Sequence, residues 1–274
     1  MAKTYLRTGE LKRMLRAHRS LQFETNPVGM KLKAGGDTAW ARAVLGQYSF
    51  LPRRIVELLG LAVRGMVGGW PEVEKELKRN IGEELGKETA GISHFNILKR
   101  CFKEELRLDV DTVPLGEGTS SFLCQVSEAL RKDSRAHIAG VVCALEDSAI
   151  LELEVVAKII NSYAELAGHR SLPIQLAALR NKSRLPQIRQ RDAGNLSLED
   201  FFVLHLLVFE QLHSSELYKT VAPYILSESD FNDLVTAYEW TLGQMDLWWT
   251  ALADLDSKEF LEEGRTLPRS RGWR

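Results

Sequence analysis

Six histidines are the side chains best suited to metal or acid–base chemistry, and two of them share one apolar segment. His205 and His213 lie in the same run of mostly apolar residues, and Glu210 stands three positions before His213. Such side chains are costly to bury unless they are paired or bound to a metal ion. A metal ion would satisfy all three. The alternative is that Glu210 and His213 face solvent and that His205 is a hydrogen-bonded core residue.

A second group of candidate ligands precedes His94. On one straight helix at about 100° per residue, Glu83 would lie about 20° and Glu84 about 80° away from His94 around the axis. Gly86 and Gly91 lie in between and permit a break, so this geometry leaves both glutamates open. The simpler alternative is an acidic helix end that is solvated.

Glu146 is a third candidate, because it lies beside Cys143 and Leu145 in the most apolar predicted helix. A glutamate on the helix surface is the alternative. Three helices that each offer Glu or His near an apolar face are typical of a carboxylate-bridged di-iron bundle. The ferritin-like version needs two Glu-x-x-His pairs, and Glu210-x-x-His213 is the only one in the sequence.

The elements that must position these side chains are predicted to be helices. Apolar residues recur at spacings of three and four, strand-like alternation is scarce, and the chain has only eight prolines. We predict an all-α bundle of about seven to nine helices. The expected ranges are 5–18, 39–50, 53–67, 71–85, 89–105, 119–131, 135–166, 197–220 and 228–263.

The domain organisation is expected to be simple. Residues 1–263 form one helical domain, and 264–274 form a basic flexible tail. The polar segment 168–197 is interrupted by prolines and is the best candidate for an insertion that covers a site or contacts a partner. Its basic residues could bind an acidic substrate, or they are simply solvated.

The charge balance and the length of the apolar runs limit the kinds of partner that we expect for this protein. Lys and Arg number 36 against 37 Asp and Glu, so the basic excess typical of nucleic-acid binders is missing. The most apolar stretch, 201–209, is far shorter than the roughly 20 residues of a membrane span. Three scattered cysteines and no apolar signal region lead us to expect a cytoplasmic protein with a small-molecule substrate, and neither nucleic acid nor a membrane as partner.

The motifs resemble, in order and spacing, those of the haem-oxygenase-like di-iron oxidases and oxygenases, a superfamily of iron-containing redox enzymes. The resemblance covers residues 40–220. Its first part is Asn80-x-x-Glu83-Glu84-x-Gly86 followed by His94. Its second is the small and apolar run Gly140-Val141-Val142-Cys143-Ala144-Leu145-Glu146, and its last is Phe201-Phe202-x-x-His205 followed by Glu210-x-x-His213.

The last motif departs from the pattern of this superfamily, whose members space these ligands at i, i+4 and i+7 and carry Asp at the second. Here the spacing is i, i+5 and i+8, and the carboxylate is Glu210. On a regular α-helix, Glu210 would lie about 140° and His213 about 80° around from His205. One inserted residue in a π-bulge returns the three side chains to the same face of the helix, so we predict a π-bulge or kink between Leu206 and Glu210.

The resemblance implies a haem-oxygenase-like helical bundle that binds two iron ions and uses O₂ as co-substrate to oxidise a small organic molecule, an amine or amino acid. The implied ligands are Glu57, Glu84, His94, Glu146, His205, Glu210 and His213. The first three would bind one iron and the last four the other, with bridging carboxylates. Glu57 is the choice for a ligand from an earlier helix, with Glu24 as the alternative.

Two other functions stay open. One is a metal-free enzyme of the same fold, similar to thiaminases or to enzymes of quinone biosynthesis. The other is a non-enzymatic helical interaction protein that uses segments 168–197 and 264–274 as contact surfaces. A homodimer and an external electron donor are compatible with the main interpretation.

Overall fold

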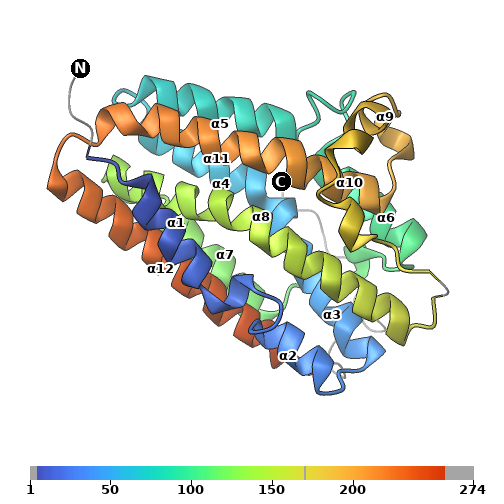
Figure 1. Cartoon of the computed structure of the whole chain (residues 1–274). Coiled ribbons are helices and arrows are strands. Elements are labelled where there is room, and N and C mark those ends of the chain that lie inside the picture. Colours follow the sequence, from blue (N-terminus) through green and yellow to red (C-terminus); the bar gives the residue numbers. More distant parts are fainter. Residues whose placement is uncertain (1–4, 170, 257–274) are drawn as a thin grey trace, which may run out of the picture.

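The computed structural model describes residues 5–169 and 171–256, and within these ranges every long element is a helix (Figure 1). The helices are α1 (Thr8–Ala17), α2 (Pro27–Lys33), α3 (Thr38–Tyr48), α4 (Phe50–Met66), α5 (Pro71–Glu84), α6 (His94–Glu105), α7 (Glu117–Ala129), α8 (Arg135–Leu166), α9 (Leu185–Arg189), α10 (Leu198–Leu204), α11 (Glu210–Val221) and α12 (Glu228–Ala253). A π-turn, His205–Phe209, joins α10 to α11.

The predicted all-α bundle is confirmed. If α10, the π-turn and α11 are taken as one helix, the described ranges contain nine helices of ten residues or more. Helix α8 has the predicted bounds because Ser134 caps its first turn and Gly168, at φ +75°, ends it. Helix α2 was not predicted, and α6 begins at His94 instead of residue 89.

The later start of α6 has a local cause. Gly91 has a φ of +84°, which no helix interior adopts, and the side chain of Ser93 accepts a hydrogen bond from the backbone N–H of Asn96. Glycine and N-cap together therefore end the α5–α6 connection immediately before His94.

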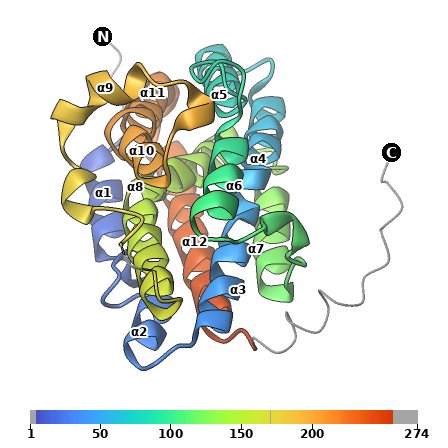
Figure 2. The ribbon, with the colours of Figure 1, turned by 90° about the vertical axis from the view of Figure 1, so that its right-hand side faces the viewer.

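Helix α8 runs through the bundle and is buried along most of its 32 residues (Figures 1 and 2). Helix α12 packs along one side of it, while α11 lies between α5 and α8. Gly140 permits the close approach of α8 and α12, since a Cβ there would lie 2.2 Å from the carbonyl oxygen of Leu234. The long central helix thus carries side chains toward both α11 and α12.

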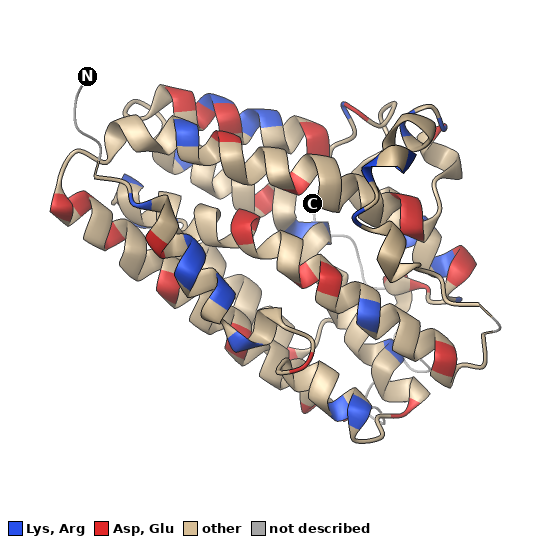
Figure 3. Cartoon of the chain, in the orientation of Figure 1, with Lys and Arg blue, Asp and Glu red and all other residues tan. Residues whose placement is uncertain are grey.

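The segment after α8 consists of short helical turns and α9, as its prolines indicate. Three of its arginines pair with carboxylates of the same chain: Arg180 with Glu154, Arg184 with Glu199, and both Arg184 and Arg191 with the buried Asp200. Charges of both signs are interspersed along the helices (Figure 3). These ion pairs dock the segment onto α8 and α10.

Two expectations concern parts of the chain that lie outside or at the edge of the described ranges. The last helix ends at Ala253, earlier than the predicted residue 263, and the part of that prediction beyond residue 256 and the tail 264–274 fall outside the described ranges. Among the described helices, none combines the length and the apolar character that crossing a lipid bilayer requires.

Candidate metal centre

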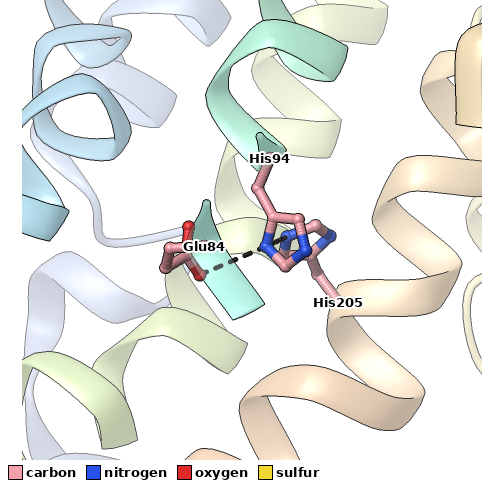
Figure 4. A group of neighbouring side chains, drawn as sticks. All are labelled: Glu84, His94 and His205. Atoms are coloured by element: carbon pink, nitrogen blue, oxygen red, sulfur yellow. Dashed lines mark hydrogen bonds and ion pairs between the residues drawn. The ribbon is translucent and has the colours of Figure 1, made fainter. Parts of the chain in front are cut away.

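Three helix ends converge on one group of ligands. Glu84 is the last residue of α5, His94 is the first of α6, and His205 begins the π-turn (Figure 4). The Nδ1 atom of His94 lies 3.2 Å from Glu84 Oε1 and 3.2 Å from His205 Nε2. One ligand atom of each residue lies within 4.8 Å of the other two.

Gly86 makes the turn between Glu84 and His94 possible. Its φ is +101°, and a Cβ at this position would lie 2.6 Å from the backbone of Ile92. Only glycine tolerates both conditions without strain. The chain can therefore reverse directly after α5, and the structure selects Glu84 as the neighbour of His94.

A second group shares Glu84 with the first. One ligand atom each of Glu84, Glu210 and His213 also lies within 4.8 Å of the others. Glu146, from the middle of α8, adds a carboxylate whose Oε2 atom lies 3.3 Å from His213 Nδ1. Six of the seven predicted ligands are thus brought together from α5, α6, α8, the π-turn and α11.

The predicted π-bulge is confirmed. Residues His205–Phe209 form a π-turn in an otherwise α-helical segment. A π-turn accommodates one residue more than an α-turn, and this compensates for the spacing of five between His205 and Glu210. All three ligands of this segment therefore face the same interior space.

The distribution of ligands between the two groups differs from the prediction. His205 was expected beside Glu146, Glu210 and His213, but its Nε2 atom lies next to His94 and Glu84. His205 stands at the beginning of the π-turn and His213 one α-helical turn beyond its end, so the two imidazoles are displaced along the helix axis and reach different groups.

Glu57 was the wrong choice for the ligand from an earlier helix. Its side chain is 60% exposed and forms an ion pair with Arg54, because it projects from the outer face of α4. The alternative, Glu24, is wrong as well, since it is 63% exposed and pairs with Lys158. The wall that α4 presents to the site consists of apolar side chains such as Ile55 and Leu59.

The imidazole of His205 is held in its neutral form. Its Nδ1–H donates a hydrogen bond to the carbonyl of Phe201 at 2.8 Å, and since a carbonyl only accepts, Nε2 carries a lone pair. Burial lowers the pKa of His205 to about 3, so the ring stays uncharged. A fixed tautomer with the lone pair facing inward is the arrangement of a metal-binding histidine.

His213 is held in a different way. Its Nε2 atom lies 2.7 Å from Glu83 Oε2, and its Nδ1 atom faces Glu146 and Glu210. Burial opposes protonation, but the neighbouring Glu146 and Glu83 outweigh it and raise the pKa of His213 to about 11. Arg79 forms a close ion pair with Glu83 and so fixes this carboxylate from the outside.

The ligand carboxylates also differ from one another. Burial raises the pKa of Glu210 to about 8, against the attraction of His213. Burial opposes ionisation of Glu84 too, but hydrogen bonding and attraction by His94 outweigh it and lower the pKa. Glu84, at the junction of the two groups, therefore stays ionised more readily than Glu210.

Sequence reasoning missed two buried acids of α8. The carboxylate of Asp147 accepts hydrogen bonds from Ser214, Tyr218 and Tyr238, the last at 2.9 Å. Glu152 is 3% exposed, and burial raises its pKa to about 8. For Glu152 a signal was available, since positions 145, 149, 152, 156 and 159 follow the helical spacing of the apolar face.

A small cavity of about 90 Å³ contains the two groups. Its polar lining comes from the metal-ligand candidates, Tyr48 and Glu152, and its remaining walls are mostly apolar. A larger cavity of about 670 Å³ lies on the other side of the π-turn, where Glu83 and Phe209 separate it from the histidines.

The donor set fits a pair of transition-metal ions. Atoms bound to one metal at about 2.0–2.2 Å lie about 3 Å apart, which is the separation found around His94 Nδ1. Three imidazoles with three carboxylates are suitable ligands for iron and similar metals. Hydrogen bonds on the outward nitrogens of His205 and His213 supply the supporting contacts of such sites.

The fold and the site define an all-α bundle with a buried histidine–carboxylate cluster. The chain belongs to the family described as a domain of unknown function with a solved structure, DUF3865, which matches residues 8–179. This match includes Glu84, His94 and Glu146 and ends before His205. No functionally curated protein matches the chain.

Two solved structures resemble the whole bundle, and both are of a CADD-like protein of unknown function from Nostoc punctiforme PCC 73102. The structure at 2.00 Å resolution has 27% sequence identity and a TM-score of 0.74, covering 92% of this chain and 96% of that one. The structure at 1.35 Å has 25% identity and a TM-score of 0.71, with coverages of 95% and 97%.

Proposed function

We propose that this protein is a non-haem di-iron enzyme with a haem-oxygenase-like bundle that uses O₂ to oxidise a small organic molecule. The observation that carries the proposal is the position of Glu84. Its carboxylate belongs to both ligand groups, one with His94 and His205 and the other with Glu210 and His213. A carboxylate shared between two histidine-containing groups is suited to bridge two metal ions.

The residues would divide into two sets. His94 and His205 would bind one iron, His213 and Glu210 the other, and Glu84 would contact both. Glu146 lies on the His213 side. When bound, the iron pair supplies the redox chemistry with O₂ that the side chains of this chain cannot supply by themselves.

The protein holds the candidate ligands in fixed orientations and keeps water away from the site. The Phe201 carbonyl fixes the proton of His205 on Nδ1, and Glu83 fixes a proton of His213 on Nε2. Apolar side chains of α4 and α10 cover the site and limit the access of water. Such preorganisation keeps donor atoms in place before a metal or substrate arrives.

The test begins with metal-free protein titrated with Fe(II) in the absence of O₂. We expect about two irons per chain, consumption of O₂ when air is admitted, and a lower melting temperature after a chelator removes the metal. The double variant His94→Ala/His213→Ala should bind no iron pair, whereas Glu24→Ala, on an exposed residue, is the matched control. Full iron loading of the double variant would refute the proposal.

A further inference from the structure

The larger cavity, here called the outer cavity, lies outside the metal centre. Its volume of about 670 Å³ is typical of sites that bury a small organic molecule. The cavity beside the candidate ligands, at about 90 Å³, has roughly the volume of three water molecules in the liquid. A molecule as large as a fused pair of aromatic rings therefore fits the outer cavity and exceeds the inner one.

The walls of the outer cavity are held in place by contacts within the chain. The guanidinium group of Arg100 donates hydrogen bonds to the carbonyls of Ala193 and Leu196, which both line the cavity. The loop between α5 and α6 forms another wall, and there the hydroxyl of Thr89 donates to the carbonyl of Ile92. The cavity is thus formed before a ligand binds.

A third wall is apolar and incompletely covered. Leu204, Val208 and Leu212, each four residues after the last, line the outer cavity from α10, the π-turn and α11. The side chain of Leu212 is 39% exposed. A ligand with an apolar body would remove this surface from water, which is favourable.

The charged side chains of the outer cavity balance one another. Besides Glu83, which is paired with Arg79, the walls carry two acidic and two basic residues: Glu88, Asp192, Arg189 and Arg191. With both signs present in equal number, the walls favour neither an anion nor a cation. A neutral molecule with an apolar body is the class of ligand that they fit best.

Two side chains, Phe209 and Glu83, separate the outer cavity from the histidines, and they differ in how they are held. Glu83 forms two ion pairs, so its displacement would break both. The ring of Phe209 packs on the rings of His94 and His205, with centroids 4.7 and 5.3 Å away. Rotation of a side chain needs free volume, and the outer cavity provides it on the other side of Phe209.

We propose that the outer cavity binds the organic molecule that the enzyme oxidises, a neutral molecule with an apolar body, and that rotation of Phe209 admits it to the metal centre. This inference rests on the proposed function, because it names the substrate class and the entry route of the same enzyme. Leu204, Val208 and Leu212 then contact the bound molecule, and Phe209 acts as a positioning residue.

The first experiment measures binding by isothermal titration calorimetry with three probes that share one ring system: 2-naphthol, 2-naphthoate and 2-naphthylmethylammonium. It uses Zn(II)-loaded protein, in which no redox reaction occurs, and metal-free protein. The variants are Leu212→Asp, which places a charge in the outer cavity, and Leu247→Asp, which makes the same change at a 63% exposed position of α12.

We expect 2-naphthol to bind native protein and Leu247→Asp equally, and Leu212→Asp at least tenfold more weakly, with or without metal. Both charged probes should bind native protein more weakly than 2-naphthol. Absence of 2-naphthol binding, or equal binding by native protein and Leu212→Asp, would overturn the assignment of the site. A charged probe that binds as tightly as 2-naphthol would overturn the substrate class.

The second experiment follows the loss of Zn(II) to the chelator pyridine-2,6-dicarboxylate. Phe209→Ala and the control Phe201→Ala each remove a ring that packs on His205, but only the first joins the two cavities. Phe209→Ala should lose Zn(II) at least tenfold faster than Phe201→Ala, and 2-naphthol should slow this loss. Phe209→Trp, with a larger ring, should lose Zn(II) no faster than native protein.

Equal rates of loss in Phe209→Ala and Phe201→Ala, or rates that 2-naphthol leaves unchanged, would overturn the role of Phe209. If native protein bound no metal, the proposed function would fail, and the role of Phe209 with it. Binding of 2-naphthol by metal-free native protein and by the two leucine variants would still decide whether the outer cavity is a site for apolar molecules.

Discussion

The two halves of the candidate centre have similar ligands but opposite electrostatics. The half with His94 and His205 contains an uncharged imidazole held by a backbone carbonyl, with a pKa near 3. The half with His213 contains an imidazole surrounded by Glu83, Glu146 and Glu210, with a pKa near 11. Under the proposed function, a metal ion would bind His205 without displacing a proton from its inward nitrogen, whereas at His213 it would have to displace one.

The comparison also shows what stabilises the protein before a metal binds. In the second half, protonated His213 neutralises buried carboxylates and so acts as their internal cation. In the first half, His205 makes neutral hydrogen-bond contacts with the Phe201 carbonyl and with His94 Nδ1, and several ring contacts. The same residue type therefore has a large electrostatic role in one half and a small one in the other.

The largest expected effect distinguishes the two histidines. In metal-free protein, His213→Gln should lower the free energy of unfolding by about 3–5 kcal/mol, because it leaves the buried carboxylates of Glu146 and Glu210 without a cation, whereas Glu83 keeps Arg79. His205→Gln should cost only about 1–2 kcal/mol, the value of its neutral hydrogen bonds to Phe201 and His94. Urea unfolding with a chelator present measures both, and equal losses would contradict the contrast between the halves.

A smaller effect is expected at the support of the second half. Asp147 on α8 accepts hydrogen bonds from Ser214 and Tyr218 of α11. Ser214 directly follows His213, and Tyr218 lies one helical turn beyond Ser214. Asp147→Asn should lower the free energy of unfolding by about 1–3 kcal/mol. The amide nitrogen of asparagine only donates, so its single oxygen cannot accept hydrogen bonds from all three hydroxyl groups. Thermal and urea unfolding provide the measurement.

Tyr238→Phe is the matched control for this network, because it removes one of the three donors and leaves the acceptor intact. Its cost should be about 1 kcal/mol. Should Asp147→Asn be as stable as the native protein, the network would not be what holds α8 against α11.

The smallest effect concerns Glu57, which lies outside both halves. Glu57→Gln should change the free energy of unfolding by less than about 0.5 kcal/mol and leave the metal content unaltered, because the side chain is exposed and its ion pair with Arg54 is on the surface. The metal content of Glu57→Gln is compared with that of Glu84→Gln, which should lose metal, and this comparison shows whether Glu57 is a metal ligand. A loss of metal in Glu57→Gln would restore the original prediction.

The sequence predicted the bundle well because helix periodicity and caps are local. Ser134 and Gly168 delimit α8, and the spacing of His205, Glu210 and His213, compared with the i, i+4, i+7 pattern of the superfamily that the chain resembles, predicted a π-turn. Each of these inferences concerns a single helix. Helix α2 was not predicted because it is a single short element whose Asn26 cap was not distinguished from a loop residue.

The errors concern the rotation of one helix relative to another. Glu57 lies on a helix that does border the site, but the sequence does not say that Ile55 and Leu59 face the cavity and Glu57 faces away. The same limit applies to Glu83 and Glu84. Both lie close to the centre, and only the turn at Gly86 determines which of them meets His94 and which supports His213.

The π-turn has a consequence for tolerance to deletion. Because His205–Phe209 contains one residue more than the helix needs, removal of Leu207 would convert the turn to regular α-helix and restore the i, i+4, i+7 spacing. The same deletion elsewhere in that helix would rotate every side chain beyond it by about 100°. Within the described part of this helix, the π-turn is thus the place where one residue can be deleted while the candidate ligands still face the same interior space.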